Sequence, residues 1–178
     1  MALKATVFKA KLQVADLDRH YYAEHRLTLA RASSETDERL MVRIIAFALN
    51  AGEDLLLTSE MAETEEPSLW RKDPGGRIRL WIEVGLPEPR RLKKASGRAD
   101  EVLLYLYHGR QARLWWEANR AELEAIRGLA VVELAQDSVR ELAALAERSM
   151  DLQVTIQDAQ ASFTHEGGIL ELGLTRLL

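Results

Sequence analysis

The segment from Val102 to Tyr107 is a nearly continuous apolar run, and it limits the possible folds more than any other segment. A strand with one face in water alternates apolar and polar side chains, whereas a strand buried on both faces is apolar throughout. The run therefore predicts a central strand covered on both sides. Helical patterns at residues 88–98 and 111–126 flank it along the chain, which indicates a mixed α/β class.

The remaining segments predict strands that pair at both ends of the chain. We expect strands at 3–14 and 20–31 around a turn at 16–18, strands at 68–72 and 78–84 around the turn 73–76, and later strands at 130–134, 152–157, 161–164 and 169–172. Helices are expected at 34–49, with Ser34 able to cap its first amides, and at 137–148. The prediction is one domain, residues 1–178, with a central mixed parallel and antiparallel sheet flanked by helices.

Composition excludes several classes of protein. The 178 residues are 47% hydrophobic, enough for a well-buried core, and the absence of cysteine removes disulfides, thiolate catalysis and cysteine zinc sites. The four histidines lack helical metal spacing, which argues against a zinc site or a catalytic triad. No glycine loop suits a nucleotide triphosphate, and no organic cofactor is expected. The first residues lack the apolar core of a signal peptide, and no run reaches the roughly 20 apolar residues that span a bilayer. We expect a soluble, cytoplasmic protein with no membrane partner.

Charge is distributed unevenly along the chain. The net charge of −4 argues against a protein that coats nucleic acid non-specifically. Acids gather at Glu60, Glu63, Glu65 and Glu66, and bases at Arg71, Lys72, Arg77, Arg79, Arg90, Arg91, Lys93, Lys94 and Arg98. The pattern predicts a mildly acidic protein with one basic surface region.

Glu83 is the strongest chemical clue, because it ends the apolar strand 81–84 just before the cationic helix start at Arg90 and Arg91. A carboxylate there, facing Lys94, suits a divalent metal beside a phosphate, and Arg91 is expected to contact an anionic substrate. Cations at a helix start oppose its dipole, which favours a nearby anion. The alternative is that Glu83 only pairs with Arg79 on the same strand.

Two further polar features accompany Glu83. Glu38 begins the apolar stripe Met41, Val42, Ile45 and Leu49, so it is either a carboxylate facing the sheet or a solvated residue of the first helical turn. Gln153, Thr155 and Gln157 share one strand face, which is either exposed to solvent or lines a pocket.

Several short segments of the sequence together resemble the YaeQ family of bacterial proteins, and the resemblance covers essentially the whole chain. They are Met1-Ala2-Leu3-Lys4-Ala5-Thr6, Ser34-Glu35-Thr36 with Glu38-Arg39, Glu66-Pro67 with Trp70, Leu80-Trp81-Ile82-Glu83 with Gly85, Lys94-Ala95, Trp115-Trp116, and Leu152-Gln153 with Thr155-Ile156-Gln157-Asp158.

The resemblance implies a variant of the PD-(D/E)XK nuclease fold, which is a restriction-endonuclease-like fold. In that superfamily, acids and a lysine bind Mg²⁺ and activate water against a phosphodiester. Glu83 matches the strand acid and Glu38 an additional helix acid, while Gln153 and Gln157 are candidate pocket groups. Ser68 stands where an acid is expected and Gly85 where the lysine is expected, so Lys94 would have to supply that charge.

Three interpretations follow from these residues and this resemblance. The first is a Mg²⁺-dependent phosphodiesterase in which Glu83 and Glu38 hold the metal and Lys94 stabilises the phosphate. The second is a nuclease-fold protein without catalysis that binds nucleic acid or a protein partner, because Ser68 replaces an acid. The third is a structural ion-pair network in which Lys94 satisfies Glu83.

Overall fold

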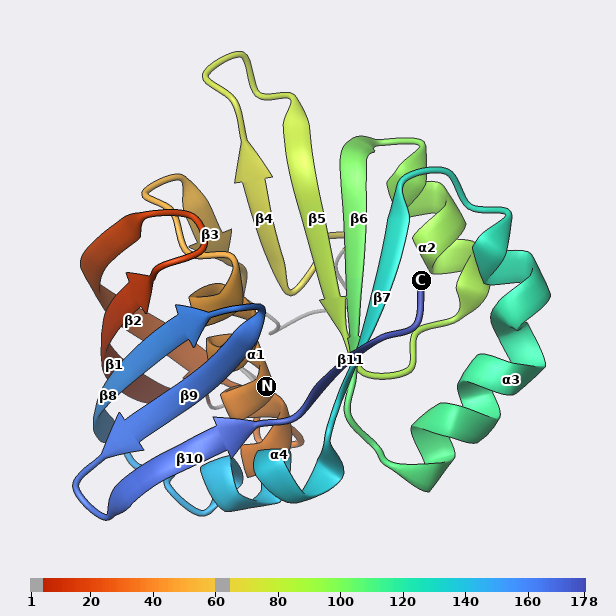
Figure 1. Ribbon diagram of the computed structural model, residues 1–178. Helices are drawn as coiled ribbons and strands as arrows, with labels where there is room; N and C mark the ends of the chain where they lie inside the picture. The colour runs from red at the N-terminus through yellow and green to blue at the C-terminus, as the bar shows by residue number, and fades with distance from the viewer. Residues whose placement is uncertain (1–4, 60–64) are drawn as a thin grey trace.

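The computed structural model describes residues 5–59 and 65–178, and in them the chain forms two sheets and four helices (Figure 1). The five-stranded sheet has the order β10-β9-β8-β1-β2 and the six-stranded sheet the order β11-β7-β6-β5-β4-β3. The strands are β1 (Thr6–Asp16), β2 (Tyr21–Arg31), β3 (Leu55–Leu57), β4 (Leu69–Lys72), β5 (Ile78–Val84), β6 (Ala99–Leu106), β7 (Leu129–Leu134), β8 (Ser149–Gln157), β9 (Gln160–His165), β10 (Gly168–Leu172) and β11 (Leu174–Arg176). The helices are α1 (Asp37–Leu49), α2 (Pro89–Ser96), α3 (Arg110–Glu124) and α4 (Gln136–Ala143).

The five-stranded sheet joins the two ends of the chain. The hairpin β1–β2 is antiparallel, and β1 pairs in parallel with β8, so that Leu12 lies opposite Leu152. Every second residue of β8 is buried, which matches its alternating sequence and leaves the other face in solvent. The alternation of apolar and polar residues therefore predicts which face of this sheet is buried.

The six-stranded sheet contains the predicted central strand. Strands β5, β6 and β7 run parallel, with α2 and α3 as the connections between them, as parallel pairing requires. Val102, Leu104 and Leu106 of β6 pack with α2 and α3, while Tyr105 and Tyr107 pack in the core on the opposite face. The central strand is thus buried on both sides.

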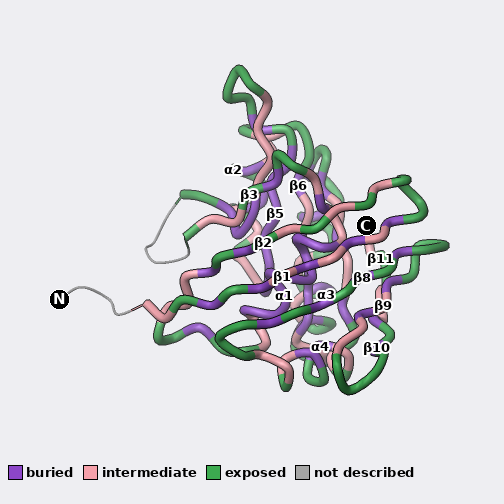
Figure 2. Tube along the Cα trace, turned by 90° about the vertical axis from the view of Figure 1, so that its left-hand side faces the viewer, coloured by how far each residue is buried: buried purple, intermediate pink, exposed green. Residues whose placement is uncertain are grey.

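Helix α1 connects the two sheets. Its residues Leu40 to Ala48 are all buried, and all of them except Arg43 share one apolar core with strands of both sheets (Figure 2). A second core lies between the six-stranded sheet and helices α2 and α3. Among the described residues, no helix is long and apolar enough to span a membrane.

The mixed α+β class is confirmed, and several details differ from expectation. The strands divide into two sheets, where the sequence suggested one central sheet. Thr36, not Ser34, caps α1 by accepting from the amide of Arg39 at 3.1 Å. Helix α4 ends at Ala143, short of the predicted residue 148, because the chain turns to pair β8 with β1 from Ser149. The short strands β3 and β11 were not predicted.

Candidate functional site at the carboxyl end of strand β5

Glu83 lies buried at the end of β5, with its side chain 6% exposed. Its Oε1 accepts hydrogen bonds from the indole Nε1 of Trp81 at 2.9 Å and from Nε of Arg91 at 2.8 Å. After β5 the chain turns at Gly85, whose φ of 96° suits glycine, and Pro89 opens α2. This turn brings the first turn of α2 back over Glu83, so that a guanidinium neutralises the buried carboxylate.

The segment before β4 is held against α2 by cations. Arg91 donates from Nη2 to the carbonyl of Glu66 at 2.6 Å, and Arg98 donates to the carbonyl of Glu65 at 3.1 Å. Lys94 is exposed, and its Nζ lies 2.5 Å from Oε1 of Glu65. This hydrogen bond lowers the pKa of the Glu65 carboxyl below its usual value. The structure therefore places Lys94 on Glu65, while Arg91 occupies the position beside Glu83.

Ser68 directly precedes strand β4. β4 begins at Leu69, which pairs with Ile82 in the antiparallel register, and the same register continued by one residue sets Ser68 opposite Glu83. Ser68 is 2% exposed, and its carbonyl accepts from the amide of Thr58 at 3.1 Å. The position where an acid would supply a second carboxylate is thus occupied by a buried serine.

Helix α1 contributes a second group of charges near the same end of the sheet. Arg39 donates from Nη1 to the carbonyl of Val84 at 3.1 Å, and Glu38 is half-buried. Burial lowers the pKa of His108, which follows β6, while the charge of Glu38 opposes that effect. Glu38 therefore lies within electrostatic range of His108, and neither of the two residues is fully solvated.

The described residues fit Mg²⁺ poorly as they are arranged. Mg²⁺ is usually bound by one or two carboxylates with waters and substrate oxygens. Glu83 is committed to a guanidinium and an indole, and no group of three or more His, Cys, Asp or Glu side chains able to hold a metal occurs in residues 5–59 and 65–178. Glu60 and Glu63, which contribute to the acidic stretch of the sequence, lie outside the described residues.

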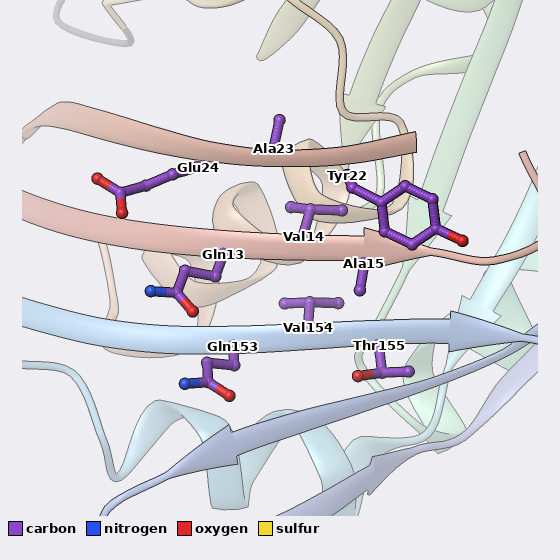
Figure 3. Close-up of a pocket in the computed structure, with 9 residues that line it drawn as sticks. All are labelled: Gln13, Val14, Ala15, Tyr22, Ala23, Glu24, Gln153, Val154 and Thr155. Atoms are coloured by element: carbon purple, nitrogen blue, oxygen red, sulfur yellow. The ribbon is translucent and has the colours of Figure 1, made fainter. Parts of the chain in front are cut away.

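Gln153 and Gln157 lie on the other sheet, away from Glu83. Both are exposed on the outer face of β8. Gln153 lines a shallow groove of about 340 Å³ with Gln13 and Tyr22, whose side chains Figure 3 shows on neighbouring strands of the five-stranded sheet. Gln153 and Thr155 thus line a hollow on an exposed strand face, Gln157 is not among its lining residues, and the hollow is separate from the end of β5.

A row of cations and indoles extends from Glu83 across the six-stranded sheet. Lys72 Nζ lies 3.4 Å from the ring centroid of Trp70, Trp70 and Trp81 meet edge to face at 6.1 Å, and Arg98 lies 5.1 Å from the centroid of Trp81. We call Lys72, Trp70, Trp81 and Arg98 the cation–indole row. The sequence interpretation missed this row, although Trp70 and Lys72 alternate on β4 and Trp81 and Glu83 on β5.

Together these features define a class: a two-sheet mixed α+β protein with an ion-paired polar site where a parallel strand ends. The family model described as YaeQ protein matches residues 1–174. The chain is 42% identical over 175 residues to the uncharacterised YaeQ protein of Escherichia coli (strain K12), covering 98% of this chain and 97% of that one. The chain belongs to the YaeQ family.

Solved structures agree with this assignment. The crystal structure of the YaeQ protein from Xanthomonas axonopodis pv. citri matches with a TM-score of 0.93 and 40% identity, covering 98% of each chain. The YaeQ protein from Pseudomonas syringae also gives a TM-score of 0.93, at 31% identity, covering 98% of this chain and 96% of that one. The two-sheet architecture is therefore that of the YaeQ proteins.

Proposed function

We propose that this YaeQ-family protein binds nucleic acid along the cation–indole row and the exposed cations of α2, without metal-dependent hydrolysis. The supporting observation is the row itself, which leads from Lys72 to the Glu83–Arg91 pair. Single-stranded nucleic acid is bound by cations that follow its phosphates and by aromatic rings on which its bases stack. Trp70 is half-buried and Trp81 is 2% exposed, so Trp70 is the indole of the row proposed to stack with a base.

The charges around this surface favour binding that depends strongly on salt. Lys94 and Arg98 both lie against Glu65, with Arg98 Nη1 3.8 Å from its Oε2. Phosphates would compete with that exposed carboxylate for the same cations. Because each phosphate contact releases a counterion, we expect affinity to fall steeply with salt concentration.

The test is fluorescence anisotropy of a labelled single-stranded oligonucleotide, titrated with the protein in EDTA at several salt concentrations. Lys72→Gln and Arg98→Gln each remove one cation of the row. We expect each to weaken binding and to reduce the slope of log affinity against log salt by about 0.7 per lost contact.

Arg120→Gln is the matched control, because Arg120 lies on α3, is 63% exposed and pairs with Glu124. The control should bind as the wild type does. Equal weakening in all three variants would indicate only a general loss of positive charge. Absence of binding in EDTA at low salt would reject the proposal.

A second candidate function is the Mg²⁺-dependent phosphodiesterase implied by the nuclease-like superfamily. It is favoured by one observation, the position of Glu83 at the end of a parallel core strand. In this candidate Glu83 and Glu38 hold the metal, and Lys94 and Arg91 contact the phosphate. Because Arg91 neutralises Glu83, it would have to leave that carboxylate first.

Calorimetric titration with Mn²⁺ and Mg²⁺ distinguishes the candidates. Metal binding by the wild type that disappears in Glu83→Gln, with metal-dependent cleavage of an oligonucleotide, would support the phosphodiesterase. The proposal of binding without hydrolysis predicts that metal titration of the wild type and of Glu83→Gln gives the same weak heats of binding. It also predicts no cleavage, including when substrate phosphate is present.

A further inference from the structure

A cleft of about 510 Å³ lies where the two sheets meet, away from the carboxyl end of β5. Its lining includes Arg19, from the β1–β2 turn, Arg71, from β4, and Arg176, from β11. Glu101 of β6 is the only carboxylate among its described lining residues. Three arginines that are far apart in the sequence therefore border one hollow.

Each arginine is fixed by part of its guanidinium. Arg19 donates from Nε to Asp16 at 2.6 Å and from Nη1 to the carbonyl of Ala51 at 3.0 Å. Arg71 donates from Nε to Asp54 at 3.0 Å and from Nη2 to the carbonyl of Asn50 at 2.9 Å. Asp16 is 2% exposed, so the first of these anchors is itself held within the fold.

The remaining donors are available to a ligand. In the described part of the chain, no hydrogen bond uses Nη2 of Arg19, Nη1 of Arg71 or either Nη of Arg176, whose Nε donates to the carbonyl of Leu178 at 3.0 Å. Guanidinium groups present planar pairs of N–H donors that match the oxygens of phosphate and carboxylate. Because the anchors already fix these side chains, less rotamer entropy is lost on binding.

The rest of the lining sets the character of the ligand. Leu49, Leu80 and Leu103 form an apolar wall, and beside it Asn50 donates from Nδ2 to the buried hydroxyl of Tyr105 at 2.8 Å. Asp16 and Asp54 each offset part of the charge of the arginine that they anchor. The hydrogen-bond donors, rather than long-range attraction, then provide the affinity.

We propose that this cleft binds a small organic anion, with a phosphate or carboxylate group held by Arg19, Arg71 and Arg176 and an apolar body against the leucine wall. This site is separate from the surface proposed for nucleic acid. It assigns the three arginines a ligand-binding role in addition to their contacts within the fold.

The test is calorimetric titration of the full chain with phenyl phosphate, benzoate and phenol. We expect the two acids to bind at one site per chain and phenol not to bind, since phenol lacks the anionic group. The tighter of the two acids identifies the ligand as a phosphate or a carboxylate. No binding of either acid at millimolar concentration would overturn the proposal.

Three variants test the residues. Arg176→Gln, on an exposed edge strand, should weaken acid binding about tenfold, the effect of losing one charge-assisted hydrogen bond. Glu101→Gln removes the acid of the lining and should tighten binding several-fold, which a purely structural role would not produce. Arg120→Gln, outside the cleft, should leave affinity unchanged.

Unchanged affinity in both cleft variants, or equal weakening in the Arg120→Gln control, would contradict the site. The outcome is independent of the nucleic-acid assay, because Lys72→Gln and Arg98→Gln alter residues outside the cleft lining. Failure of one proposal therefore leaves the other standing.

Discussion

At the scale of single residues, the pairing of the buried Glu83 with the partly exposed Arg91 determines how the site is interpreted. The Glu83 side chain is 6% exposed and that of Arg91 37% exposed, so the carboxylate is far more desolvated than the guanidinium. A desolvated carboxylate is stabilised by a charged hydrogen-bond donor, which here is Arg91. The pair explains how a carboxylate is stabilised at the end of a core strand by a charged neighbour.

A double-mutant cycle tests this coupling. We expect Glu83→Gln to reduce the free energy of unfolding by about 1–3 kcal/mol, less than for a fully buried pair because Arg91 is partly solvated. Arg91→Gln should cost a similar amount or more, and the double variant should cost less than the sum, with a coupling energy of about 1–3 kcal/mol. Urea denaturation measures all four proteins, and strictly additive effects would show that the two side chains do not act as a pair.

His108 gives a prediction for pH. Burial lowers its pKa from the ordinary value of 6.5, so between the folded pKa and 6.5 the unfolded chain binds more protons than the folded one. Stability should therefore rise with pH through this window and fall as acid is added. His108→Gln should flatten that rise in urea unfolding measured from about pH 5 to 8. His25, whose pKa burial also lowers, is present in both proteins and cancels in the comparison. An identical pH profile in the variant would contradict the assignment.

At the scale of elements, the parallel pairing of β1 with β8 holds the two ends of the chain together. Leu12 is fully buried in this pairing, whereas Val7 of the same strand is 49% exposed. Leu12→Ala should lower the free energy of unfolding by about 2–5 kcal/mol, because it leaves a cavity between the sheet and α1. Val7→Ala, the matched control, should change stability by only about 0.5 kcal/mol. Equal effects in thermal or urea unfolding would show that this sheet face is not core.

Most elements could be predicted from local pattern, and the exceptions have physical causes. The strands and helices around Val102 to Tyr107 follow from apolar periodicity and turn residues, which are local signals. Helix α4 ends earlier than its alanine-rich sequence suggests, because pairing of β8 with β1 competes for the chain at Ser149. Strands β3 and β11 are only three residues long, too short for alternation to reveal.

At the scale of the whole molecule, the site was the hardest feature to predict. The sequence placed Glu83 near the end of a core strand, as the structure does, but it left the burial of this acid open. The choice between Arg91 and Lys94 as its neighbour depends on how α2 turns back over β5. Gln153 joins a groove on the other sheet because long-range pairing, which local patterns do not report, divides the strands into two sheets. The three arginines of the cleft were also not predicted as a group, because they come from distant segments that only long-range pairing brings together.

The most direct test of the account is the anisotropy titration of a single-stranded oligonucleotide in EDTA, followed by Mg²⁺ addition and analysis of the oligonucleotide for cleavage. The account predicts salt-sensitive binding in EDTA, weakened in Lys72→Gln and Arg98→Gln, and an intact oligonucleotide after Mg²⁺ is added. Cleavage that requires Mg²⁺ and is lost in Glu83→Gln would contradict it and establish the phosphodiesterase instead.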